Sequence, residues 1–254
     1  MLPVIENALI FFPTKALHAT PAYISLHYED VTIATTDGQQ LHGWWVPTDN
    51  ATAVVALFHG NAGNISDRVH LVQLLHGLRV TTFLFDYRGY GNSTGDPSEA
   101  GMYEDARSAV SWLLNERQVP VEKLILFGRS LGGAAAIEAA STISPAGVIL
   151  EGAFTSARDM ARTMPLGFLL QYFLRTRLDN LDKIASLTAP LLCMHGTRDT
   201  VVPYELGERL YQQAPEPKQW YPVQGADHND TQQIGGAGYA NALKDFIRQV
   251  CPGG

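Results

Sequence analysis

The sequence predicts an α/β protein in which a mostly parallel, doubly wound sheet follows an N-terminal antiparallel hairpin. Residues 28–35 and 40–46 alternate in polarity on either side of Thr36-Asp37-Gly38-Gln39, as the two strands of a hairpin do. After Pro47, continuous apolar runs alternate with helical stretches. This second pattern is typical of parallel strands that are covered on both faces of the sheet.

The individual elements follow from the same two patterns. The apolar runs predict strands at residues 53–58, 80–85, 123–127, 146–150, 190–194 and 219–223. Helical periodicity predicts helices at residues 67–78, 99–116, 130–141, 204–213 and 238–250. The 254 residues contain neither repeats nor low-complexity linkers, so we expect one domain over residues 1–254.

The composition excludes several classes of function. Hydrophobic residues make up 46% of the chain and charged residues 17%, as in ordinary folded proteins. The net charge of -7 and the lack of a Lys/Arg cluster argue against a nucleic-acid partner. Cys193 and Cys251, the only two cysteines, do not form a disulfide framework. We therefore expect a cytoplasmic protein, with membrane association as the alternative.

The N-terminal residues 1–24 are expected to form an arm. Their apolar group, residues 8–12, is too short to span a bilayer and lacks the basic start and cleavage site of a secretory signal. Two interpretations remain open. The first, which we favour, is an arm packed on the body of the protein. The second is the stub of a membrane-proximal segment.

A candidate nucleophile lies between the apolar run 123–127 and a helix of small residues. The stretch Gly128-Arg129-Ser130-Leu131-Gly132 has the G-x-S-x-G pattern at a strand-to-helix junction. Such a junction places the serine in a strained backbone geometry that presents its hydroxyl at the carboxyl edge of the sheet. The new helix also directs unpaired N–H groups toward an oxyanion formed there. The alternative is an ordinary strand–helix connection.

A general base and an acid that orients it follow later strands. Asp199 comes after strand 190–194, and His228 comes after strand 219–223. We expect His228 to take the proton of Ser130 and Asp199 to hold the imidazole in the useful tautomer. Along the chain the serine comes first, the acid second and the histidine third, which is an order known for serine hydrolases.

Both assignments have alternatives. Asp199 is also placed to cap the helix at 204–213, and His228 is also consistent with an exposed histidine that has no role. Glu151, just past another strand end, and Asp227, beside the histidine, are the rival acids.

The loop after strand 53–58 is the expected second side of an oxyanion hole. Its glycines allow close backbone approach, and we assign the donors to the N–H groups of Asn61 and Leu131. The alternative is a glycine turn that serves topology alone. We expect the rings of His59 and His195 to brace their loops rather than to act as bases.

The next loop, residues 86–93, follows strand 80–85 and is rich in glycine and aromatic residues. Asp86 and Arg88 are close enough along the chain for an ion pair that braces this loop.

Residues 155–188 are expected to form a short helical lid that decides the substrate. Ser156-Ala157-Arg158-Asp159 is a capping-box pattern, and Pro165 suits the first turn of a second, apolar helix. We predict that this second helix lines an acyl pocket with Phe168, Leu169, Tyr172 and Phe173. The alternatives are a core helix without substrate contact and a helix that docks on a lipid surface. About 30 residues make only a shallow cap, which favours short or medium acyl chains.

From about residue 25 to residue 250 the chain resembles the α/β-hydrolase superfamily. Within it, the chain is similar to the small serine hydrolases related to the mammalian depalmitoylase-type ABHD proteins. The matching segments are residues 59–64 (HGNAGN), 86–91 (DYRGYG), 128–133 (GRSLGG), 195–203 (HGTRDTVVP) and 225–228 (GADH). The resemblance implies ester or thioester hydrolysis with Ser130 as nucleophile. Some relatives carry an N-terminal membrane helix or a lipidated cysteine cluster, and this sequence shows neither.

These observations predict a serine carboxylesterase that needs neither a metal nor an organic cofactor. Its expected partner is a small-molecule ester or acyl substrate, with peripheral membrane contact as an additional possibility. The alternatives within the same mechanism are an acyl-protein or acyl-CoA thioesterase, a monoacylglycerol or lysophospholipid lipase, and a peptidase. From another class, the alternative is a non-catalytic binding protein that retains the fold.

Overall fold

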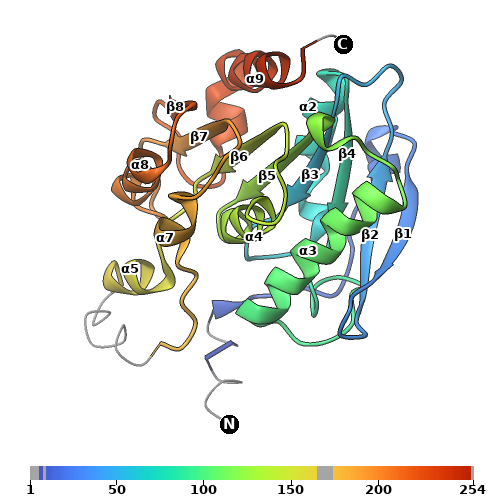
Figure 1. The fold of residues 1–254 in the computed structure, drawn as a ribbon, viewed down its shortest axis with the longest axis horizontal. Coiled ribbons are helices and arrows are strands. Elements are labelled where there is room, and N and C mark those ends of the chain that lie inside the picture. The colour runs from blue at the N-terminus through green and yellow to red at the C-terminus, as the bar shows by residue number, and fades with distance from the viewer. Residues whose placement is uncertain (1–5, 8–9, 165–173, 253–254) are drawn as a thin grey trace.

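The computed structural model describes residues 6–7, 10–164 and 174–252. Eight strands form one sheet in the order β1-β2-β4-β3-β5-β6-β7-β8 (Figure 1). Their bounds are β1 Glu29–Ala34, β2 Gln40–Val46, β3 Ala53–Phe58, β4 Val80–Phe85, β5 Leu124–Arg129, β6 Gly147–Glu151, β7 Leu191–Gly196 and β8 Lys218–Val223. Each strand lies within one or two residues of the range that the apolar pattern predicted.

The pairing of the strands confirms the predicted sheet. β1 pairs antiparallel with β2, and β2 pairs antiparallel with β4, so the hairpin is attached to one side of the parallel strands. All pairs from β4 across to β8 are parallel. Because β3 lies between β4 and β5, the chain changes direction across the sheet there. Ligands of open α/β sheets bind outside the carboxyl ends of strands at such a switch point.

Helices cover both faces of the sheet. Their bounds are α2 Val69–Gly77, α3 Glu99–Asn115, α4 Leu131–Ala140, α5 Ala157–Arg162, α7 Asn180–Ile184, α8 Tyr204–Gln213 and α9 Thr231–Val250, with 3-10 turns at Pro21–Ile24, Ile65–Arg68 and Val121–Lys123. The side chains of α3, α4, α7 and α8 pack in one core, and those of α2 and α9 pack in a second. Figure 1 shows α3 and α4 in front of the strands.

Strand β5 shows why the parallel strands have continuous apolar runs. Leu124 and Leu126 face the core that contains α4, whereas Ile125 and Phe127 face the core that contains α2 and α9. All four side chains are fully buried. A strand with helices on both sides has no face left for polar residues, so its sequence does not alternate.

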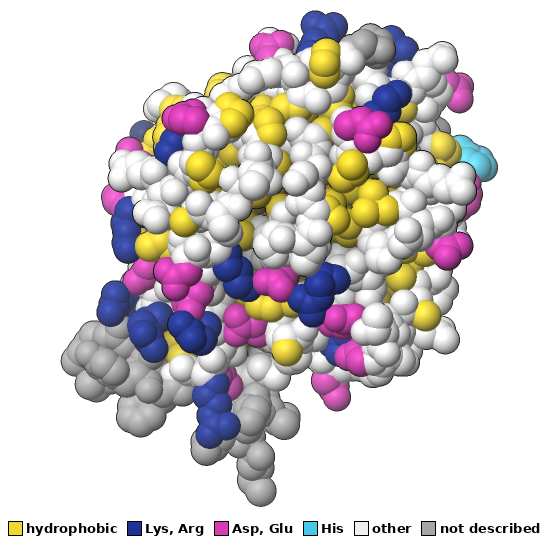
Figure 2. All heavy atoms as spheres, viewed as in Figure 1, with side chains coloured by type: hydrophobic (Ala, Val, Ile, Leu, Met, Phe, Trp, Pro, Cys, Tyr) yellow, Lys and Arg dark blue, Asp and Glu magenta, His cyan; other side chains and the backbone are white. Residues whose placement is uncertain are grey.

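The helices on the α4 side are linked by charged side chains. Arg107 of α3 pairs with Glu104 at 2.9 Å and with Glu138 of α4 at 2.7 Å. Lys183 of α7 pairs with the other oxygen of Glu138 at 2.6 Å. Figure 2 shows side chains of both charges gathered below the apolar patches on this face. These pairs align three helices, although exposed ion pairs contribute little free energy singly.

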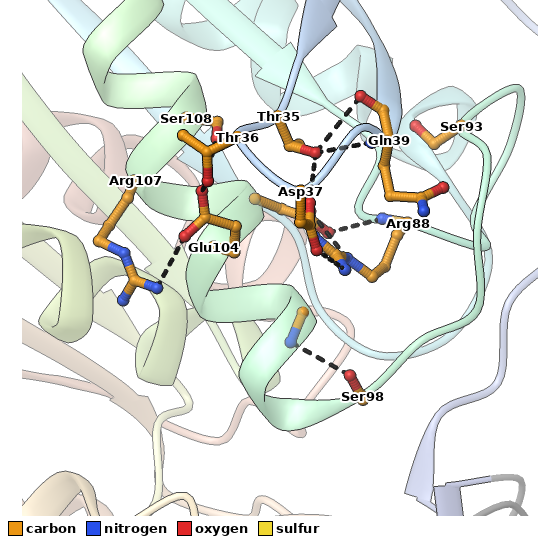
Figure 3. Close-up of polar contacts among 12 residues, drawn as sticks. Thr35, Thr36, Asp37, Gln39, Arg88, Ser93, Ser98, Glu104, Arg107 and Ser108 are labelled. Carbon is orange, nitrogen blue, oxygen red and sulfur yellow. Dashed lines mark hydrogen bonds and ion pairs between the residues drawn. The ribbon is translucent and has the colours of Figure 1, made fainter.

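The predicted ion pair between Asp86 and Arg88 is wrong. Arg88 instead donates to Asp105 of α3, at 2.9 Å from Nε and 2.7 Å from Nη2. It also donates to Asp37 of the hairpin turn, at 2.7 Å from Nη1 (Figure 3). The carboxylate of Asp86 accepts from the backbone N–H of Ile65 at 2.9 Å. The two side chains therefore serve different neighbours, one the 59–65 loop and the other helix α3.

Arg88 also changes the acidity of the hairpin turn. Its hydrogen bonds, together with one from the Thr35 hydroxyl, lower the pKa of Asp37 to about 2. A carboxylate that accepts such bonds is favoured in its charged form. Arg88 thus ties the hairpin to α3, and Asp105 is completely buried beneath it.

Cys193 and Cys251 are both buried free thiols, which agrees with the expectation from the sequence. Among the helices of the described residues, none has the length and apolar character needed to cross a lipid bilayer.

We expect Arg88→Met to lower the free energy of unfolding by about 3 kcal/mol, because it leaves the buried Asp105 carboxylate without its counter-charge. Arg177 pairs with Asp179 at a site where 71% of the arginine side chain is exposed. Arg177→Met is the matched control and should cost less than about 1 kcal/mol. Urea unfolding of both variants measures the difference, and equal losses would contradict the role assigned to Arg88.

Candidate active site

Ser130 occupies a strained turn between β5 and α4. Its φ is 52° and its ψ is -119°, although it is not a glycine. Its backbone N–H donates to the carbonyl of Glu151 at the end of β6, at 2.8 Å. A positive φ at a non-glycine residue costs energy and is typical of residues held for function. The G-x-S-x-G pattern predicted this backbone geometry.

Glycines are required on both sides of this turn. A Cβ on Gly128 would lie 2.5 Å from the carbonyl oxygen of Gly132, and a Cβ on Gly132 would lie 2.0 Å from that of Phe58. Both distances are far below van der Waals contact. Because Gly132 lacks a side chain, α4 can begin directly against the end of β3, and because Gly128 lacks one, the first turns of α4 can pack closely on β5.

The loop that carries Asn61 lies against this turn. A Cβ built on Gly60 would lie 3.4 Å from the Cβ of Ser130, so the loop passes beside the serine. Among the described residues, no acceptor forms a hydrogen bond with the backbone N–H of Asn61 or of Leu131. These are the two donors that the sequence analysis assigned to an oxyanion hole.

The side chain of Asn61 fixes its loop to the N-terminal residues. Its Oδ1 accepts from the backbone N–H of Phe12 at 3.0 Å and from the hydroxyl of Tyr90 at 2.9 Å. Its Nδ2 donates to the carbonyl of Ile10. Phe11 between them is 3% exposed. Residues 10–12 therefore help to hold the loop that carries Asn61. This contact could not be predicted, because no local sequence pattern links the two segments.

Asp199 and His228 meet directly. Nδ1 of His228 lies 2.7 Å from Oδ2 of Asp199, whose side chain is only 1% exposed. The other oxygen, Oδ1, accepts from the backbone N–H groups of Val201 and Val202 at 2.9 and 2.7 Å. Nε2 of His195 also lies 3.3 Å from Oδ2. Together with the ring nitrogen of His228 and the two backbone N–H groups, it brings the number of nitrogen atoms around this carboxylate to four.

These donors control the acidity of Asp199. Burial by itself raises the pKa of the carboxyl, but the hydrogen bonds from His195 and His228 outweigh burial and hold the pKa well below its ordinary value. Asp199 is consequently a carboxylate at neutral pH. His195 braces the loop as predicted, since its Nε2 also lies 2.9 Å from the carbonyl of Val202.

Ser130 and this pair lie at the same edge of the sheet. Gly152 directly follows Glu151, whose carbonyl binds the Ser130 N–H. A Cβ on Gly152 would lie 3.0 Å from Cε1 of His228. In addition, Nη2 of Arg129 donates to the carbonyl of His228 at 2.6 Å. The structure thus brings the loops of the three predicted residues together.

The two rival acids are occupied elsewhere. Glu151 accepts from the hydroxyls of Thr231 and Tyr239, at 2.5 and 2.6 Å, and its Oε1 lies 3.2 Å from Nε of Arg129. Asp227 accepts from the backbone N–H of Thr200 and of His228, both at 2.7 Å, rather than from the imidazole. The carboxylate on the His228 ring is that of Asp199.

The predicted capping box at the start of the lid, residues 156–159, is half confirmed. The hydroxyl of Ser156 accepts from the N–H of Asp159 at 3.0 Å and caps α5. The reciprocal half of the capping box is wrong, because the Asp159 carboxylate accepts from the Thr155 hydroxyl at 2.6 Å. Pro165 and the predicted pocket residues Phe168, Leu169, Tyr172 and Phe173 lie outside the described residues, so the acyl pocket stays a prediction.

A metal site needs several side chains that converge as ligands. In the part of the chain that the structure describes, no three His, Cys, Asp or Glu side chains converge in such an arrangement.

Comparison with known proteins gives consistent results. The family model described as serine aminopeptidase, S33, matches residues 49–183. An uncharacterized protein of Mycobacterium tuberculosis strain H37Rv is 35% identical over 247 residues, covering 96% of this chain and 88% of that protein. The α/β hydrolase domain-containing protein WAV2 of Arabidopsis thaliana is 30% identical, covering 99% of this chain and 90% of that protein.

The fold has solved counterparts as well. The Pyrococcus furiosus esterase Pf2001 superposes with a TM-score of 0.77 at 22% sequence identity, covering 94% of this chain and 98% of that one. The match of more than half of the sequence to one family model, together with relatives of similar length, leads to one conclusion: the chain belongs to the serine aminopeptidase S33 family of the α/β-hydrolase superfamily.

Proposed function

We propose that this hydrolase cleaves carboxylic esters through an acyl-enzyme formed on Ser130. The observation that carries the proposal is a strained serine at the same edge of the sheet as the buried Asp199–His228 pair. The N–H of this serine is held by the carbonyl of Glu151. A binding protein that only retains the fold would have no use for a serine with φ of 52° at the sheet edge that also carries a histidine bonded to a buried carboxylate.

In the first step, Oγ of Ser130 attacks the ester carbonyl while Nε2 of His228 takes its proton. Asp199 accepts from Nδ1–H, which leaves Nε2 as the nitrogen that can act as base. The carboxylate then stabilises the imidazolium as it forms. Asp199 itself stays ionised throughout.

The negative charge that develops on the carbonyl oxygen is assigned to the N–H groups of Asn61 and Leu131. Leu131 is the first residue of α4, so its N–H lies at the positive end of the helix dipole. His228 next protonates the departing alcohol, and the acyl group remains on Ser130. Water activated by His228 then attacks the acyl-enzyme, and the carboxylic acid is released.

The substrate is proposed to be a small-molecule ester with a short or medium acyl chain, because a lid of only about 30 residues, as expected from the sequence, is too small to enclose a long one. An acyl-protein thioesterase and a monoacylglycerol or lysophospholipid lipase remain the alternatives. The buried free thiols of Cys193 and Cys251 support a reducing location such as the cytoplasm. Peripheral membrane contact stays a prediction.

We expect Ser130→Ala to lower hydrolysis of p-nitrophenyl esters by about 10³-fold or more, because the variant has no nucleophile. The measurement is kcat/KM across acyl chains from acetate to palmitate. Ser141→Ala, at an exposed serine at the end of α4, is the matched control and should keep wild-type rates. Wild-type activity in Ser130→Ala would disprove the assignment.

Thioester and aminoacyl amide substrates, measured with the same variants, decide between the alternatives. The family description includes aminopeptidase activity, so an aminoacyl p-nitroanilide belongs in this series. We expect the ester to react fastest. A wild-type protein that cleaves amides or thioesters, but no ester, would replace the carboxylesterase proposal with a peptidase or thioesterase.

Asp199→Asn should lower kcat by about 10³- to 10⁴-fold at pH 8, because the imidazole loses its orienting carboxylate. It should also change the pH dependence of stability. The pKa of Asp199 is lower in the folded protein than in the unfolded chain, so its pairing stabilises the fold above about pH 4 and is lost as the pH falls below that.

Thermal unfolding between pH 6 and pH 2.5 tests the second expectation. The melting temperature of the wild type should fall more steeply on acidification than that of Asp199→Asn. Parallel curves would show that Asp199 is not the ionised partner of His228.

A further inference from the structure

A cavity of about 870 Å³ opens between α2 and α9 beside the proposed catalytic edge. Its lining includes Arg68, Arg129, Glu151, Asn229, Gln232 and Tyr239. The volume is that of a site for a small molecule or for part of one. Two guanidinium groups and several amide side chains make its wall polar and rich in hydrogen-bond donors.

The cavity borders the reacting groups through the chain itself. Arg129 directly precedes Ser130, and its Nη2 is bonded to the carbonyl of His228. On the other side, Nη2 of Arg68 donates to the carbonyl of Ala62, the residue after Asn61, at 2.6 Å. The cavity therefore borders the residues next to the serine turn and the proposed oxyanion loop.

The two arginines differ in how their charge is balanced. Arg129 pairs with the buried carboxylate of Glu151 at 3.2 Å. Among the described residues, no carboxylate forms an ion pair with Arg68, and its Nε is buried without a hydrogen-bond partner. Both guanidinium groups belong to residues that line the same cavity, and burial, followed by the charge of Arg129, lowers the pKa of Arg68.

The carboxylate of Asp67, the acidic neighbour of Arg68, contacts other residues than Arg68. Its Oδ2 accepts from the backbone N–H of Asn64 at 2.9 Å, and its Oδ1 lies 3.5 Å from Nε2 of His18. It acts as the capping partner of the turn at residues 65–68. Arg68 thus lines the cavity, and among the described residues no carboxylate forms an ion pair with it.

We propose that this cavity binds the phosphate group of the substrate, and that the preferred esters carry a phosphate on their alcohol part. This inference rests on the proposed ester hydrolysis and names the substrate class. A partly buried guanidinium with unused N–H donors binds an oxyanion more favourably than water, and planar guanidinium donors match phosphate oxygens. The side chains of Asn229 and Gln232 also line the cavity and carry neutral N–H donors.

The test compares monobutyrylglycerol with its 3-phosphate, which differ only in the phosphate group. We expect the wild type to cleave the phosphorylated ester with a kcat/KM about 10-fold higher, and added salt to reduce this preference. Arg68→Gln should lower kcat/KM about 10-fold for the phosphorylated ester and less than about 2-fold for the neutral one. Arg68→Lys, which keeps the charge, should retain part of the preference.

Arg248→Gln, an equal change of charge at an exposed position late in α9, is the matched control and should leave the ratio of the two substrates unchanged. The ratio is informative even where Arg68→Gln disturbs the loop at Ala62, because such damage lowers both rates equally. An equal loss on both esters, or a wild type without preference, would overturn the proposal.

Binding of inorganic phosphate and phenyl phosphate, measured by calorimetry, separates this inference from the proposed reaction. Tighter binding of phenyl phosphate to the wild type than to Arg68→Gln supports the site, even in a protein that hydrolyses no ester. Binding of inorganic phosphate without any preference between the two esters overturns the assignment to substrate and leaves free phosphate as the ligand. Absence of binding of both compounds overturns the site itself.

Discussion

The close approach of three backbone segments around Ser130 is the constraint on which the rest of this structure depends. Helix α4 begins against the end of β3 because Gly132 carries no side chain, it packs closely on β5 because Gly128 carries none, and Ser130 adopts a positive φ in the turn between strand and helix. The surrounding sheet can hold this strained turn, since its inner strands β3 to β7 are buried and hydrogen-bonded to neighbours. The strand order places the turn at the switch point between β3 and β5.

Buried charged side chains hold the neighbouring loops in place beside that turn. Glu151 accepts hydrogen bonds from the hydroxyls of Thr231 and Tyr239 and pairs with the guanidinium of Arg129. These contacts connect the end of β6 to α9. The loop with His228 lies between these anchors. Because each buried polar atom of Glu151 has a partner, the cost of burying the carboxylate is offset, and the loop has one favoured position.

Sequence patterns predicted the local features well and the side-chain partners less well. The strands, the serine turn and the N-cap at Ser156 each depend on residues close together in the chain. The pairing of Arg88 with Asp37 and Asp105 was missed because it joins residues 51 and 17 positions apart. The same reason applies to Asn61, whose amide is held by residues 10–12 and Tyr90, and to the network around Glu151.

The sequence by itself determined the class of fold, the order of its strands along the chain and the residues able to form a serine, acid and histidine set. Apolar periodicity and glycine spacing are patterns within short stretches of the sequence, so they can be recognised without knowing how the chain folds. Only the tertiary structure decided that the imidazole of His228 contacts Asp199 rather than Glu151 or Asp227. It also revealed that Arg68 faces a cavity without a carboxylate partner among the described residues. Partner choice depends on which loops meet at the sheet edge, and that is fixed by packing of the two cores rather than by any short stretch of sequence.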